Sequence, residues 1–276
     1  MRILAGIGLL LVCLTFGIVA ADTAGLISTE PAGSPQDPPP SAAARAGAAA
    51  PDETVHAVGA IMVLVIVASG LVRLVARPAR ASAAYHVLSS MAGLLLTVPI
   101  VGDPDNYGGQ AGPIDPVFVV VALPCVVGAL LARPWRARRV AGGVRLRLLA
   151  LAAVGAVPAA VYGIDQALMQ RNSFPPSADP HHNAHWWVMS VFVFTVVLVL
   201  LASAAGRPGW RWSAATGSVG IIALGAASLL VPSAASALGT AWGAAAVAGG
   251  LTGLWLVRPG PQAGGTGTGT VAARAA

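Results

Sequence analysis

Three of the protein's five histidines lie within five residues of one another, at the start of a long apolar run. If this run is helical, His181, His185 and Met189 share one stripe, because they are spaced at i, i+4 and i+8. Two imidazoles at i and i+4 chelate a transition-metal ion, and a thioether one turn further along suits copper. The stripe therefore predicts a metal site, and copper and zinc are the metals that fit it.

A second group of polar side chains ends the preceding apolar run. Tyr162, Gln166 and Gln170 are also spaced at i, i+4 and i+8, and Asp165 stands beside them. Polar groups inside a membrane span are costly and usually face the protein interior. The short connection 171–178 makes this run and the histidine-bearing run antiparallel neighbours, so the two polar stripes are expected to face each other.

His56 begins a different apolar run and can supply a third ligand from another helix. Paired with His181 or His185 it would also allow haem ligation, which fits less well than copper or zinc. The expected metal ligands are His56, Asp165, His181, His185 and Met189, and the expected cofactor contacts are Tyr162, Gln166, Gln170 and His182.

Other interpretations of these residues stay open. Trp186 and Trp187 with the histidines are also typical of a purely structural belt at the membrane interface. The stripe of Tyr162 and the two glutamines would suit a small-solute or proton-coupled transporter, although no inverted repeat is apparent. A di-iron oxidase is disfavoured, because five histidines are too few. We therefore expect a binding or assembly module more than an enzyme.

His86 lies at the start of its own apolar run, on the side opposite the other four histidines. Helical rise separates it from the three-histidine cluster by roughly 20 Å or more. We expect Arg73 or a backbone carbonyl to be its partner, and a proton-relay role is the less favoured alternative.

The composition requires a membrane. Of 276 residues, 56% are hydrophobic and 9% are charged, and the mean hydropathy is +0.77, which together exclude a soluble domain of this size. All 16 basic residues are arginine, so Schiff-base chemistry has no lysine to use. The arginines flank apolar runs, which is typical of membrane orientation, so we expect no nucleic-acid partner despite the net charge of +6.

The apolar runs predict an all-α polytopic transmembrane bundle of about eight spans, or seven if the first is a cleaved signal peptide. Arginine-rich connections alternate with acidic ones, which predicts cytoplasmic arginine loops and, with the first helix retained, two cytoplasmic termini in a bacterial plasma membrane. The eight runs are 3–20, 56–76, 83–101, 116–132, 148–169, 180–204, 214–231 and 236–257.

Four regions follow from this pattern. Residues 1–21 form the first span or signal peptide, 22–54 a disordered Pro/Ala-rich linker, 55–257 a seven-helix membrane domain, and 258–276 a disordered tail. The lipid bilayer is the expected partner. Glycines spaced four apart at 239–243 and 249–253 predict close helix packing, either within a hairpin or against a membrane-protein partner or second copy.

Overall fold

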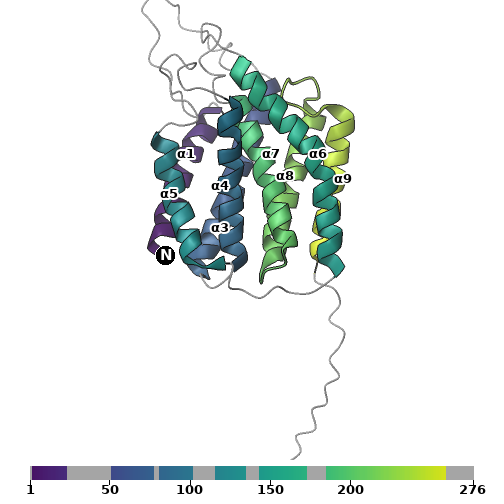
Figure 1. Cartoon of the computed structure of the whole chain (residues 1–276). Coiled ribbons are helices and arrows are strands. Elements are labelled where there is room, and N and C mark those ends of the chain that lie inside the picture. The colour runs from purple at the N-terminus through teal and green to yellow at the C-terminus, as the bar shows by residue number, and fades with distance from the viewer. Residues whose placement is uncertain are drawn as a thin grey trace, which may run out of the picture.

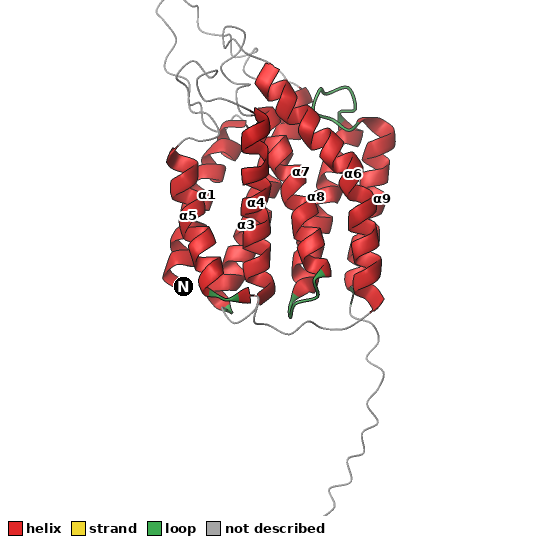
Figure 2. Cartoon of the chain, viewed as in Figure 1, coloured by secondary structure: helices red, strands yellow, loops and turns green. Residues whose placement is uncertain are grey.

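The computed structural model describes residues 2–23, 51–77, 81–101, 116–134, 143–172 and 185–258. These residues form helices and short turns without any strand (Figure 2). Six of the helices are long and apolar enough to cross a membrane, and the apolar stretches described in α1 and α5 are shorter. The predicted helical bundle is confirmed, and the protein is an integral membrane protein. The eight helices are α1 (Arg2–Thr23), α3 (Pro51–Ala76), α4 (Ala81–Val101), α5 (Pro116–Leu131), α6 (Gly143–Asn172), α7 (His185–Ala204), α8 (Trp210–Leu230) and α9 (Gly239–Val257).

Successive helices run in alternating directions between two ends of the bundle (Figure 1). One end, here called the arginine end, carries Arg73, Arg145 and Arg207. The other, here called the acidic end, is where α3 and α7 begin and where α6 finishes. Charge is therefore sorted along the bundle as the sequence predicts, which places the candidate site residues at the acidic end.

Helix α7 is the most buried of the six long helices and packs against α3, α4, α6 and α8. It runs parallel to α3, because both helices begin at the acidic end. The two stay in register: Gly59 of α3 lies on Met189 of α7, and seven residues further along, Ile66 and Val196 both border Gly220 of α8. A residue of α3 is thus level with the residue of α7 numbered 130 higher, as the Gly59–Met189 and Ile66–Val196 pairs show.

Glycines allow the closest helix contacts, as in other membrane bundles. A Cβ atom built on Gly93 of α4 would lie 2.7 Å from the backbone of Thr195 on α7. On α8, a Cβ at Gly225 would lie 2.6 Å from the carbonyl oxygen of Gly243 on α9. Gly243, Gly250 and Gly253 of α9 thus pack closely on α8, whereas Cβ atoms at Gly239 and Gly249 would meet nothing within 4 Å, so the predicted glycine pairs are only partly used in the hairpin.

Helix boundaries differ from the apolar runs at several ends. Helix α3 begins at Pro51, whose fixed φ suits a first helical residue. Helix α9 begins at Gly239, with a positive φ of 73°, so Ser236 belongs to the preceding loop instead of the predicted helix. The expected start of the sixth apolar run, at 180, lies outside the described residues, as do most of 22–54 and all of the tail beyond residue 258.

Candidate functional site at the acidic end

A buried histidine links three elements at the acidic end. His56 of α3 is 1% exposed, and its Nε2 lies 2.7 Å from the hydroxyl of Ser236 in the α8–α9 loop. The hydroxyl of Tyr162 on α6 donates to the carbonyl oxygen of Ser236 at 2.6 Å. Ser236 thus receives contacts from both α3 and α6, and the orientation of the His56 ring is fixed by a buried hydroxyl.

A second chain of hydrogen bonds joins α6, α7 and α4. The side-chain oxygen of Gln170 accepts the backbone N–H of Trp187 at 3.2 Å, which satisfies a donor in the first turn of α7. The indole Nε1 of Trp187 donates to the hydroxyl of Thr97 at 2.7 Å. Trp187 is 6% exposed, so it connects helices inside the bundle and does not face lipid headgroups as a belt residue would.

Neighbouring residues on α6 face opposite ways. Gln166 is buried, and its Oε1 has no hydrogen-bond partner among the described residues, while its Nε2 lies 3.7 Å from the sulfur of Met169. Asp165 is exposed, on the same stripe as the exposed apolar residues Val161 and Leu168. The structure therefore brings Tyr162, Gln166 and Gln170 into the interior and places Asp165 on the outer face of the helix.

Met189 is fully buried, with its sulfur against Gly59 of α3. His185 precedes Met189 by one turn on α7, and His56 precedes Gly59 by one turn on α3. Because α3 and α7 are parallel and in register, His56 is level with Trp186, and His185 lies one residue nearer the acidic end on the adjacent helix. The side chain of His185 lies outside the described part of the structure, as do His181 and His182 entirely.

Within the described ranges, no three His, Cys, Asp or Glu side chains gather closely enough to hold a metal ion. The ligand candidates that are buried and described are His56 and Met189. The buried oxygen of Gln166 is a further polar atom at this end of the bundle. That His181, His182 or Asp165 completes a ligand set stays a prediction. His181 and His182 are outside the described residues, and Asp165 lies on the exposed face of α6.

Three members of the network, Ser236, Thr97 and Trp187, were not expected as site residues. Ser236 and Thr97 are single polar residues at the ends of apolar runs, and serine and threonine commonly bond to their own helix backbone there. Only the packing of distant helices shows that these hydroxyls contact His56 and Trp187, at separations of 180 and 90 residues.

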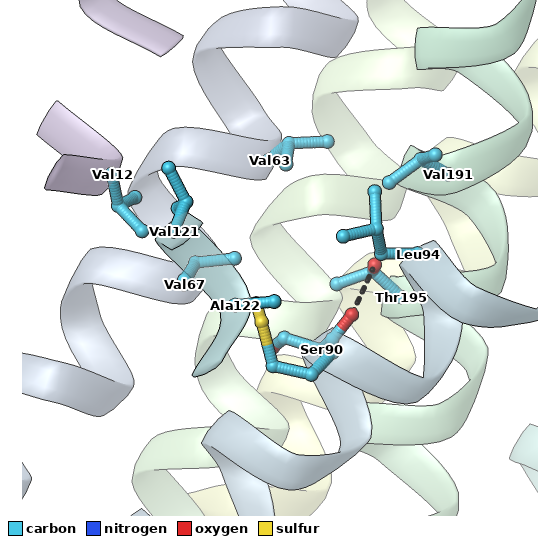
Figure 3. Close-up of a pocket in the computed structure, with 10 residues that line it drawn as sticks. Val12, Val63, Val67, Ser90, Leu94, Val121, Ala122, Val191 and Thr195 are labelled. Atoms are coloured by element: carbon cyan, nitrogen blue, oxygen red, sulfur yellow. Dashed lines mark hydrogen bonds between the residues drawn. The ribbon is translucent and has the colours of Figure 1, made fainter. Parts of the chain in front are cut away.

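A small cavity of about 10 Å³ lies deeper in the bundle, between α1, α3, α4, α5 and α7 (Figure 3). Its lining is mostly apolar, and Thr195 Oγ1 donates to the carbonyl oxygen of Ser90 at its edge, at 3.4 Å. A cavity of this volume holds at most one water molecule. The cavity is therefore a packing defect of the membrane core and offers no room for a solute in this conformation.

The chain matches no protein-family model, no characterised protein and no solved structure in the three comparisons made. The fold defines an integral membrane protein built as a helical bundle, and any activity has to be argued from the geometry of its polar residues.

Proposed function

We propose that this protein binds a transition-metal ion, or a cofactor that contains one, at the acidic end of the bundle, and acts as a binding or assembly module of the membrane. His56 of α3 and His185 of α7 are the proposed imidazole ligands. Met189 is the proposed thioether ligand, one turn deeper. His181 and His182 lie four and three residues before the start of α7 in the chain and are proposed as further ligands.

One observation supports the proposal most strongly: the contact between Gly59 and Met189 sets α3 and α7 in register. With that register, His185 lies within one residue of the level of His56 on two parallel, touching helices. Two histidines from adjacent helices are a common basis for metal and haem sites in helical bundles. The pairing differs from the chelate of His181 and His185 expected from the sequence, because its ligands come from two helices.

The surroundings of His56 suit a ligand. Metal-binding histidines usually hold their second ring nitrogen on an oxygen, which fixes the tautomer and the ring orientation. Ser236 is in that position for His56, and Tyr162 in turn holds Ser236 through its carbonyl oxygen. The buried oxygen of Gln166 adds a neutral acceptor for which the described residues provide no donor, and a bound cation or its water would satisfy it.

The orientation in the membrane follows from charge. The arginine end is the proposed cytoplasmic side, because arginine-rich connections stay in the cytoplasm. The histidine site then faces the outside of a bacterial plasma membrane, where a module that accepts or hands over metal would be accessible to extracytoplasmic partners.

The test is metal analysis of the full-length protein, purified in detergent and loaded with copper or zinc. We expect the wild-type protein to retain one of the two metals, and the variants His56→Ala and His185→Ala each to lose it. Met189→Leu should lower the retention of copper more than that of zinc, whereas the matched variant Met91→Leu, also a buried methionine, should retain both. Equal metal content in wild-type and both histidine variants would rule the proposal out.

A further inference from the structure

The loop between α8 and α9 lies at the acidic end of the bundle (Figure 2). Ser233 and Ala235 of this loop are exposed, whereas Ser236 is fully buried. The hydroxyl of Ser236 lies 2.7 Å from Nε2 of His56 on α3, which is itself 1% exposed. A buried polar group is costly unless it is hydrogen-bonded, so the two side chains stabilise each other inside the bundle.

The backbone on either side of Ser236 is held to the end of α8. The N–H of Leu238 donates to the hydroxyl of Ser228 on α8 at 3.0 Å, and Ser228 is fully buried. The N–H of Ala237 donates to the carbonyl oxygen of Ala234 at 2.9 Å, which closes a turn around Ser236. The height of the Ser236 hydroxyl is therefore set by the end of α8.

Tyr162 fixes the same loop to α6. Its hydroxyl donates to the carbonyl oxygen of Ser236 at 2.6 Å. A phenol has one proton to donate, and in this structure the loop backbone accepts it. The bond gives Tyr162 a role that does not require contact with a bound ion or cofactor.

We propose that Ser236 holds the imidazole of His56 in the tautomer that carries its proton on Nε2, and that Tyr162 is a positioning residue that acts on His56 through Ser236. A histidine that binds a metal through one ring nitrogen usually donates the N–H of the other nitrogen to an oxygen. A hydroxyl oxygen accepts such a proton, and that of Ser236 is at hydrogen-bond distance from Nε2. The effect on metal binding rests on the proposed function, whereas the fixed tautomer is a property of the metal-free protein.

A fixed tautomer prepares His56 to bind a metal ion. In neutral imidazole one nitrogen carries the proton, and the other carries the lone pair that binds a metal. With the proton held on Nε2, the lone pair is on Nδ1, and the ring does not have to reorient when the ion arrives. Loss of a group that holds a metal ligand in place costs about 10- to 100-fold in metal affinity, which is the loss we expect from Ser236→Ala.

The first experiment measures the tautomer without metal, by nitrogen NMR of the full-length protein labelled with ¹⁵N-histidine in detergent. The signals of His56 are those absent from His56→Ala. We expect separate signals from a protonated Nε2 and an unprotonated Nδ1 in wild-type, and signals closer to their average in Ser236→Ala and, to a smaller extent, in Tyr162→Phe. The controls Ser203→Ala and Tyr85→Phe change a buried serine bonded to its own helix and a tyrosine at the arginine end. Unchanged His56 signals in Ser236→Ala would overturn the proposal.

The second experiment is a titration with copper and with zinc of Ser236→Ala, Tyr162→Phe and the double variant. We expect Tyr162→Phe to weaken binding less than Ser236→Ala does, and to cause no further loss once the Ser236 hydroxyl is absent, because the two residues act in series. An equal loss from Tyr162→Phe in both backgrounds would contradict its positioning role and indicate direct contact with the bound group.

The two experiments separate this inference from the proposed function. If His56→Ala loses metal while Ser236→Ala binds it as tightly as wild-type, the inference fails and the proposed function stands. If wild-type binds neither metal, the proposed function fails, and the nitrogen signals of His56 alone decide whether Ser236 holds the ring.

Discussion

Met189 of α7 lies with its sulfur on Gly59 of α3, and this contact sets the relative height of the two helices. The absence of a side chain at Gly59 makes room for the thioether. One turn nearer the acidic end, His56 and His185 then lie within one residue of the same level. Gly59, which is not itself a candidate ligand, thus helps to place two candidate ligands on adjacent helices, and its substitution should disturb the site without replacing any ligand.

Gly59→Val should displace Met189 and loosen the α3–α7 interface. Insertion of extra methyl groups into a packed core costs about 1–3 kcal/mol, so we expect a lower unfolding midpoint and a lower metal content. The control is Gly155→Val on α6, where a new Cβ would meet nothing within 4 Å. If Gly59→Val and Gly155→Val behave alike in thermal unfolding and in metal analysis, the Gly59–Met189 contact does not support the site.

Thr97→Val tests the hydrogen bond that Trp187 makes to α4. The change keeps the shape of the side chain but leaves the buried indole N–H without this acceptor, at a cost of about 1–3 kcal/mol. Thr252→Val is the matched control, because Thr252 is exposed and bonds only to its own helix. Chemical or thermal unfolding should separate the two variants, and equal stability would show that the Trp187–Thr97 bond contributes little.

Gln166→Leu and Asp165→Asn change adjacent residues that face opposite ways. Gln166 has a buried oxygen without a described partner, so replacement by leucine should leave the metal-free protein as stable as wild-type or more stable. In metal titration we expect Gln166→Leu to bind more weakly. Asp165→Asn should retain wild-type affinity, because Asp165 lies on the exposed face of α6. If Asp165→Asn instead binds metal more weakly than Gln166→Leu, the carboxylate of Asp165 belongs to the ligand set and this assignment is wrong.

Gly225→Ala should destabilise the α8–α9 hairpin. The new Cβ would lie 2.6 Å from the carbonyl oxygen of Gly243 and 2.8 Å from the nitrogen of Val247, so the two backbones must separate. We expect a loss of stability on the order of 1–3 kcal/mol. At Gly249 a Cβ would meet nothing within 4 Å, so Gly249→Ala should be neutral in the same unfolding assay, and a similar loss in both variants would contradict this packing.

The sequence predicted the helices well because their signal is local. Runs of about 20 apolar residues define spans, and α7 and α8 both end within one residue of the predicted position. The inward stripe of Tyr162, Gln166 and Gln170 was also predicted, because residues spaced at i, i+4 and i+8 share a helix face.

What the sequence left open depends on contacts between distant helices. The spacing of Tyr162 and Gln166 predicts a common face, but it does not show that Asp165, next to Gln166, turns outward. The bond between His56 and Ser236 joins residues 180 positions apart, and no local pattern indicates it. The register of α3 on α7 depends in the same way on which glycine meets which large side chain, and this depends on three-dimensional packing.

The most direct measurement of the central claim is a titration of the metal-free, full-length protein with copper and with zinc, as a double-mutant cycle of His56→Ala and His185→Ala. If both histidines bind one ion, each single variant should lose metal affinity by at least about tenfold. Removal of a residue that only holds a metal ligand in place already costs that much affinity. The double variant should then bind the ion little more weakly than either single variant, because the effects of two substitutions at residues that bind the same ion are not additive. Wild-type affinity in the double variant, or no binding by the wild-type protein, would contradict the claim.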